Sequence, residues 1–311
     1  TLFVGNYDFW VESSQLAAKL QANANAKKAD QIKELQEFVA RFSANASKSK
    51  QATSRKKQLE KITLDDIKPS SRKYPFIKFT PDREIGNDLV KVENVSKSIE
   101  GVKILDNISF TLRPNEKTAL ISRNDLATTT LMQIIAGSMA PDSGTVTWGQ
   151  TTSRTYLPKD INEEYAGSEL PIIDWLRQFA SKEESDNTFL RGFLGKMLFS
   201  GSDVERPVNV LSGGEKVRGM LSKMMLSRAN VLLLDDPTNH LDLESITALN
   251  DSLIDFKGAI VFTSHDHEFI QTIADHIVEV SAKGVVDRGD TTYDEYLAHE
   301  ATQGRVRSEE H

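Results

Sequence analysis

Two apolar runs in the last third of the chain, each ending in polar residues, constrain the fold most strongly. Residues 231–234 are Val-Leu-Leu-Leu and lead into Asp235 and Asp236, while residues 260–262 are Ile-Val-Phe and lead toward His265. Short continuous apolar runs of this kind are typical of parallel strands that are buried on both faces. We therefore expect neighbouring strands whose carboxyl ends present acidic and imidazole side chains at one edge of a sheet.

The sequence after Asp88 alternates between strand and helix patterns. Strands are expected at 88–95, 104–112, 117–121, 144–148, 230–235, 259–264 and 276–280. Helices are expected at 128–136, 171–180, 188–199, 213–226, 243–254 and 266–273. This alternation predicts an α/β fold of the nucleotide-binding kind.

A glycine-rich motif stands at the expected start of the helix at 213–226. It reads Leu211, Ser212, Gly213, Gly214, Glu215 and Lys216. Glycines at a helix N-terminus let backbone N–H groups approach a phosphate closely, and the helix dipole favours the anion. The motif therefore predicts contact with a phosphate.

The first quarter of the chain is locally basic although the whole chain is acidic. The chain has 311 residues and a net charge of −7, whereas residues 27–61 carry ten basic and four acidic side chains, which leaves −13 on the rest. Helical spacing of apolar residues within 13–42 and a second helical stretch near 50–62 predict an α-helical hairpin. Its basic residues suit backbone contacts to a folded RNA.

Several features indicate where units begin and end. Residues 5–10 and 289–296 both combine a turn with a Tyr-Asp pair, and the chain opens with Thr1 rather than Met. We therefore expect an internal repeat whose first copy lies upstream. The expected divisions are an upstream tail at 1–10, a helical linker at 11–83, a nucleotide-binding domain at 84–300 and a C-terminal tail at 301–311.

With its motifs in this order, the sequence resembles the ATPase domain of the ATP-binding cassette (ABC) superfamily. The glycine-rich motif resembles the ABC signature, the run ending at Asp235 resembles the Walker B strand, and His265 resembles the switch histidine. The run Pro-Thr-Asn-His-Leu-Asp at 237–242, the helical linker and the suspected repeat resemble the ABC-F branch. That resemblance implies a P-loop ABC cassette with a helical subdomain, preceded by an α-helical hairpin linker.

The segment that should form the phosphate loop departs from the family pattern. The resemblance places nucleotide contacts at Ser122, Arg123, Asn124, Thr128, Thr129, Thr130 and Lys159. Ser122, Asp125 and Ala127 stand where glycines belong, and Thr128 replaces the lysine of the loop. Side chains there hinder close approach to phosphate, and Asp125 adds a negative charge.

Other parts of the same site also depart from the pattern. Ile99 stands where an aromatic usually stacks on adenine, and Lys159 where a glutamine usually contacts Mg²⁺. Asp236 replaces the glutamate that positions the attacking water. By the resemblance, Asp236 and His265 would be the catalytic pair, and Thr129 with Asp235 would hold Mg²⁺ weakly.

These departures suggest a division of labour between two cassettes. The signature residues, Leu211 to Glu215, would complete the ATP site of a first cassette that lies outside this chain. This chain's own site would bind ATP weakly and hydrolyse little. The fragment alone would then be inactive or very weak as an ATPase.

The resemblance implies a cytoplasmic protein that acts on the ribosome in translation, using ATP and Mg²⁺, without a membrane partner. The residues expected on tRNA or ribosomal RNA are Lys48, Lys50, Arg55, Lys56 and Lys57. Alternatives are the ATPase subunit of an ABC membrane transporter and a non-catalytic interaction module. The short hairpin turn favours a housekeeping translation factor over an antibiotic-protection factor.

Composition excludes other classes of protein. The sequence has no cysteine, which rules out disulfide scaffolds and thiolate metal sites. No stretch approaches the roughly 18 consecutive apolar residues of a membrane span.

Overall fold

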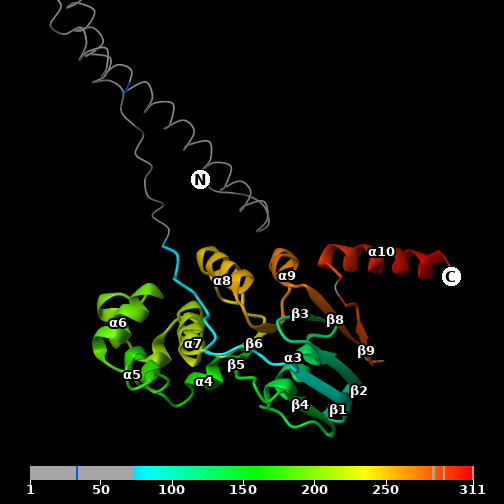
Figure 1. Cartoon of the computed structure of the whole chain (residues 1–311), viewed down its shortest axis with the longest axis horizontal. Coiled ribbons are helices and arrows are strands. Elements are labelled where there is room, and N and C mark those ends of the chain that lie inside the picture. Colours follow the sequence, from blue (N-terminus) through cyan, green and yellow to red (C-terminus); the bar gives the residue numbers. More distant parts are fainter. Residues whose placement is uncertain (1–32, 34–72, 282–283, 290, 310–311) are drawn as a thin grey trace, which may run out of the picture. The chain divides into compact units, whose positions relative to one another are not determined.

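The computed structural model describes Lys33 and residues 73–281, 284–289 and 291–309 (Figure 1). The chain divides into two compact units, Thr1–Lys73 and Tyr74–His311. The expected tail at 1–10, the hairpin helices and the five basic residues from Lys48 to Lys57 lie outside the described residues. The alternating strands and helices that begin after Asp88 belong to the second unit.

A six-stranded sheet forms the centre of this unit, with the strand order β5-β6-β7-β3-β8-β9. The strands are β3 (Lys117–Ile121), β5 (Arg154–Leu157), β6 (Val231–Asp235), β7 (Ala259–Thr263), β8 (His276–Ser281) and β9 (Gly284–Asp287). All neighbours pair in parallel except β8 and β9, which are antiparallel. The carboxyl ends of β3, β5, β6 and β7 therefore meet at one edge.

A smaller antiparallel sheet has the order β2-β1-β4, with β1 (Val90–Ile99), β2 (Val102–Leu112) and β4 (Ser143–Trp148). Helix α3 (Asp125–Ala136) packs between the two sheets and contributes Leu131 and Ile135 to a core shared with β1, β2 and β6. This core fixes the start of α3 beside the edge of the large sheet.

The second core lies on the other side of the large sheet and continues into a group of helices. These elements are α4 (Asn162–Tyr165), α5 (Ile172–Arg177), α6 (Asn187–Lys196), the 3-10 turns η1 (Gly201–Glu205) and η2 (Val208–Val210), α7 (Gly213–Ser227), α8 (Leu243–Asp255) and α9 (His267–Ile273). In Figure 1, α5 and α6 lie at the left, away from β1 and β2. They form the helical subdomain that the resemblance implied.

The chain reaches this unit along residues 74–83, which the sequence assigns to the linker. Ile77 and Phe79 are buried in the core, and the Phe79 ring packs edge-on against Phe256. The N–H of Phe76 donates to the carbonyl of Lys196, and the N–H of Asp82 donates to that of Arg228. In the structure these residues belong to the cassette.

The expected α/β fold is confirmed, and the buried parallel strands lie within a residue of their expected positions. The short strands β5 and β9 and the helices α4 and α10 (Tyr293–Glu309) were not expected. Helix α3 begins at Asp125 rather than at 128, because the Asn124 side chain caps it by accepting from the N–H of Leu126. No helix in the described parts is long and apolar enough to cross a membrane.

Candidate functional site

Parallel pairing brings the expected nucleotide residues together at one edge of the large sheet. Ser122 follows β3, Lys159 follows β5, Asp235 ends β6 and His265 follows β7. Together with Asp125 and other neighbours they line a cavity of about 140 Å³. Ligand pockets usually have volumes of roughly 300–1,000 Å³. The site is therefore assembled in the expected place, but it is small.

Three backbone N–H groups of the loop are already used within the loop itself, whereas those of Arg123 and Asp125 have no acceptor within the described residues. Asn124 donates its N–H to the Ser122 hydroxyl at 3.1 Å, and Leu126 donates to the Asn124 side-chain oxygen at 3.1 Å. Ala127 donates to the Asn124 carbonyl at 3.0 Å. A phosphate loop needs such N–H groups to point at the anion. Here a phosphate would have to break internal hydrogen bonds to reach the three that are bonded.

The Asp125 carboxylate contacts the two basic side chains that face the loop. Its Oδ2 lies 3.1 Å from Nε2 of His265 and 3.8 Å from Nζ of Lys159. These three residues come from three different segments, so the contact was not visible in the sequence. The Asp125 carboxylate thus gives these two side chains a negatively charged partner, as a bound phosphate would.

The remaining loop residues have partners within the chain, although Thr128 also lines the cavity. Thr128 is buried and donates its hydroxyl to the carbonyl of Asp125, and Thr130 is buried as well. Arg123 is exposed and pairs with Glu300 of α10 at 3.3 Å. Ile99, at the expected adenine position, packs partly buried against the core shared with β1.

Asp235 keeps features of a magnesium ligand. Its Oδ1 accepts the Thr263 hydroxyl at 2.6 Å, while its buried Oδ2 has no hydrogen-bond partner among the described residues. Burial raises the pKa of this carboxyl, and the Thr263 and Thr129 side chains oppose the shift. Mg²⁺ typically takes one or two carboxylates together with phosphate oxygens. Asp235 and Thr129 therefore fit Mg²⁺, which would neutralise the unpaired oxygen and bind a phosphate.

The neighbouring Asp236 adopts a left-handed backbone conformation with a φ of 51°. Its N–H donates to the Thr263 carbonyl at 3.2 Å and to the Thr263 hydroxyl at 3.0 Å. The turn after β6 is thus fixed by β7. Aspartate tolerates this backbone conformation better than most residues.

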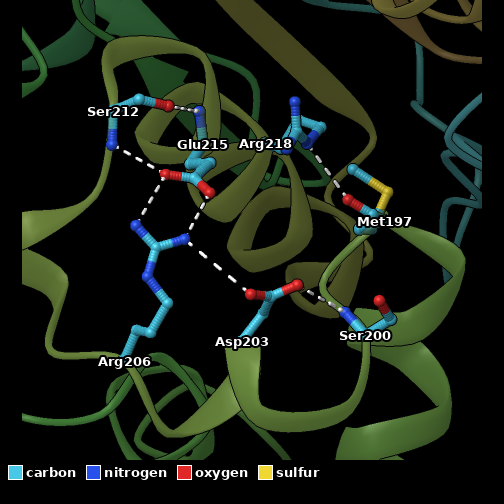
Figure 2. Close-up of polar contacts among 7 residues, drawn as sticks. All are labelled: Met197, Ser200, Asp203, Arg206, Ser212, Glu215 and Arg218. Atoms are coloured by element: carbon cyan, nitrogen blue, oxygen red, sulfur yellow. Dashed lines mark hydrogen bonds and ion pairs between the residues drawn. The ribbon is translucent and has the colours of Figure 1, made fainter.

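The signature motif forms a complete N-terminal cap of α7 (Figure 2). The Ser212 hydroxyl accepts the N–H of Glu215 at 3.3 Å, and the Glu215 carboxylate accepts the N–H of Ser212 at 2.8 Å. The N–H groups of Gly213 and Gly214 have no acceptor within the described residues. This helix start therefore leaves two amides open to an anion, and the Ser212 hydroxyl still has a hydrogen to donate.

Both signature glycines also lie against the turn that follows β6. A Cβ atom on Gly213 would lie 3.2 Å from the His240 side chain, and one on Gly214 would lie 2.8 Å from the His240 carbonyl oxygen. Packing against the backbone thus favours glycine strongly at 214, while at 213 a side chain would press on the His240 ring. The sequence alone did not reveal these contacts.

The described residues hold no cluster of three or more His, Asp or Glu side chains placed to bind a metal. Any Mg²⁺ would need oxygens from a nucleotide or from water. Tyr293, at the start of α10, also lines the cavity and was missed, because α10 has no strong apolar periodicity.

Two family models match the chain. Residues 1–79 and residues 105–239 each match a model described as ABC transporter. Both matches agree with the motifs that the sequence presents.

Curated relatives cover nearly the whole chain. It is 64% identical over 305 residues to the uncharacterized ABC transporter ATP-binding protein YkpA of Bacillus subtilis, covering 98% of this chain and 56% of YkpA. It is 40% identical to the probable ATP-binding protein YbiT of Escherichia coli O157:H7, covering 95% and 55%. It is 30% identical to ABC transporter F family member 2 of Arabidopsis thaliana, covering 94% and 43%. The chain thus spans about half the length of these relatives.

Solved structures share the fold at low sequence identity. An ATP-binding subunit of an ABC transporter matches with a TM-score of 0.55 and 22% identity, over 68% of this chain and 93% of that one. A dimeric ATP-binding cassette in a post-hydrolysis state, bound to ADP and Pi, matches with a TM-score of 0.53 and 17% identity, over 66% and 100%. The chain therefore has the α/β fold of ABC ATP-binding cassettes.

Proposed function

We propose that this chain is part of a two-cassette ATPase of the ABC-F type that acts on the ribosome in translation. Its signature residues, Ser212 to Glu215, would close over MgATP held by a partner cassette. Its own site would bind nucleotide weakly and hydrolyse little. ATP would clamp the two cassettes together, and hydrolysis would release them.

The observation that carries the proposal is the asymmetry between two helix N-termini. The start of α7 leaves the Gly213 and Gly214 N–H groups without an acceptor among the described residues. At the start of α3, by contrast, the N–H groups of Leu126 and Ala127 are bonded internally and only that of Asp125 has no acceptor there. In addition, the Asp125 carboxylate pairs with Lys159 and His265. The start of α7 could thus accept an external anion, whereas the loop before α3 already holds the Asp125 carboxylate.

Calorimetry of this chain with MgATP tests the weak-site half of the proposal. We expect no heat of binding at micromolar nucleotide, because phosphate must displace the Asp125 carboxylate and the internal hydrogen bonds of the loop. A micromolar Kd would overturn this half.

The ribosomal half rests on the basic segment at 27–61, on the match of residues 1–79 to a family model and on a relative named as an F family member. Each phosphate neutralised by Lys or Arg releases counterions, so binding should weaken steeply with salt. The domain would be cytoplasmic and need no membrane partner.

Ribosome co-sedimentation across a salt series tests this half. Reversing the charges of Lys48, Lys50, Arg55, Lys56 and Lys57 should make the plot of log K for ribosome binding against log salt shallower, reducing the magnitude of its slope by roughly 3 to 5. The matched control reverses five exposed basic residues of the cassette, namely Lys91, Lys103, Lys182, Arg191 and Lys196. Equal effects of the two sets would contradict a specific role for the first set.

The alternative is the ATPase subunit of a membrane transporter, which the description of the matching family models favours. Such a subunit would fractionate with membranes, whereas the proposed protein would fractionate with ribosomes. The opposite distribution would replace the proposal with this alternative.

A further inference from the structure

Glu215 is the last residue of the signature motif, and its carboxylate has a partner outside the motif (Figure 2). Arg206 Nη1 donates to Glu215 Oε1 at 2.6 Å, and Arg206 Nη2 donates to Oε2 at 3.3 Å. The same Oε2 accepts the N–H of Ser212 at 2.8 Å. A two-pronged contact of this type fixes the orientation of a carboxylate as well as neutralising it.

Arg206 is itself held in place by the helical subdomain. Its carbonyl accepts the N–H of Ile172 in α5 at 3.0 Å, and the adjacent Pro207 forms a β-bridge with Pro171. Its guanidinium also lies 3.9 Å from Asp203, whose carboxylate accepts the N–H of Ser200. The backbone of Arg206 therefore contacts α5, while its side chain contacts the start of α7.

The contact also decides what charge the signature presents. Burial acts to raise the pKa of Glu215, but the Ser212 N–H and the Arg206 guanidinium outweigh it and keep that pKa below its usual range. Glu215 is therefore negative. Arg206, whose pKa is raised by its hydrogen bond to Glu215, remains positive and cancels that charge.

An unpaired carboxylate at this position would oppose an incoming phosphate. The open amides of Gly213 and Gly214 belong to the same helical turn as Glu215, within the reach of a weakly screened Coulomb interaction. Two nearby basic side chains have hydrogen-bond partners outside the motif, although Arg218 Nη1 still lies close to Gly214, 4.0 Å from where a Cβ atom on that glycine would be. Lys216 donates to Asn162, and Arg218 donates to the Met197 carbonyl.

We propose that Arg206 is the positioning residue of the signature motif, which both orients the Glu215 cap and cancels its charge so that the start of α7 can accept a phosphate. The role rests on the proposed function, because it concerns the anion that the signature would meet. It also links α5 to the signature through a single residue.

The structural part is tested on this chain by hydrogen exchange. In Arg206→Gln we expect the N–H groups of Ser212 and Glu215 to exchange about tenfold faster, because the capping carboxylate loses its two-pronged donor. Arg191→Gln is the matched control, since Arg191 pairs with Glu205 on the same subdomain and does not touch the signature. Equal exchange in the wild type and in Arg206→Gln would overturn the proposal.

The charge part is tested by steady-state kinetics of the two-cassette assembly. Arg206→Gln should raise the KM for MgATP about tenfold, because the exposed carboxylate repels phosphate. Adding Glu215→Gln removes that charge but keeps an oxygen for the Ser212 N–H, so the double variant should regain most of the lost affinity. Arg206→Lys, which keeps the charge without the fork, should lie between the wild type and Arg206→Gln.

A wild-type KM in Arg206→Gln, or a double variant no better than the single one, would overturn the proposal. Ser212→Arg separates this outcome from failure of the proposed function. If Ser212→Arg abolishes turnover while the Arg206 variants match the wild type, only the present proposal fails. If Ser212→Arg retains turnover, the proposed function fails, and unchanged amide exchange in Arg206→Gln would then overturn the present proposal as well.

Discussion

Helices α3 and α7 start with similar residue types, but the acidic residue in the first turn has different partners in each. Each has a side-chain cap, Asn124 or Ser212, and each has an acidic residue in its first turn. The Asp125 carboxylate reaches across to Lys159 and His265, whereas Glu215 folds back onto its own cap and is neutralised by Arg206. Under the proposed function, the dipole of a helix start is therefore not sufficient for phosphate binding. The deciding features would be which N–H groups remain open and what cancels the acidic charge.

The largest expected effect comes from blocking the open N–H groups at the start of α7. Gly213→Asp should lower ATP turnover of the two-cassette assembly by on the order of 100-fold or more, as removal of a preorganised donor does elsewhere. The new side chain would fill the space before the amides and crowd His240. The readout is steady-state phosphate release.

Gly192→Asp in α6 is the matched control for that variant. Gly192 is exposed, and a Cβ atom there would meet nothing within 4 Å. Thermal melting of both variants separates loss of fold from loss of function. Wild-type turnover in a folded Gly213→Asp protein would show that the two helix starts do not differ in function.

The second test removes the carboxylate charge at the start of α3. Asp125→Asn should tighten MgATP binding to this chain about tenfold, since it removes a negative charge that competes with phosphate for Lys159 and His265. Titration with a fluorescent nucleotide up to millimolar concentration measures the change. Asp106→Asn, which removes another surface aspartate paired with a lysine, should have no effect. An unchanged Kd in Asp125→Asn would mean that the carboxylate does not exclude phosphate.

The third test compares the two caps directly. Asn124→Ala and Ser212→Ala should each lower the free energy of unfolding by about 1 kcal/mol, the usual cost of losing an N-cap. Only Ser212→Ala should also reduce turnover of the assembly. Denaturant melts and steady-state kinetics on the same preparations measure both quantities. Equal loss of turnover in the two variants would erase the functional difference between the helix starts.

The smallest expected effect concerns Asp235, which remains beside the closed loop. Because burial raises its pKa, the folded state holds the proton more tightly than the unfolded state, and stability falls as the pH rises above the unfolded value of 3.8. Asp235→Asn should therefore raise the free energy of unfolding at pH 7, by less than the changes expected above.

That gain should disappear near pH 3, where the wild-type carboxyl is neutral in both states. Denaturant melts at the two pH values measure it, with the exposed Asp88→Asn as control. A loss of stability at pH 7 would show that the carboxylate is better stabilised than its surroundings indicate.

The sequence alone was sufficient for the parts of the fold that depend on local pattern. The strands β6 and β7 were predicted from their continuous apolar runs, and the start of α7 was predicted from its signature. Strand β5 has one buried residue among four, and the edge strand β9 has none, so neither carries an apolar pattern. Their pairing depends on the rest of the sheet.

The site divides in the same way. The residue types expected at the loop could be compared with Ser122, Asp125 and Ala127 directly in the sequence, because the comparison needs only residue types at fixed spacing. The contact of Asp125 with Lys159 and His265 was not readable, since it joins residues that follow β3, β5 and β7. The Arg206 contact was missed for a similar reason, because nothing in residues 206–215 specifies that the intervening chain turns back.

Residues 74–86 run from the helical subdomain to the start of the large sheet's β5. Near their beginning the N–H of Phe76 is bonded to Lys196 at the end of α6, and near their end the N–H of Gly86 is bonded to the Thr151 hydroxyl just before β5. A rotation of the helical subdomain against the large sheet would therefore extend residues 74–86 or break the hydrogen bond between Phe76 and Lys196. Residues 74–86 would therefore add an energetic cost to any such rotation of the helical subdomain.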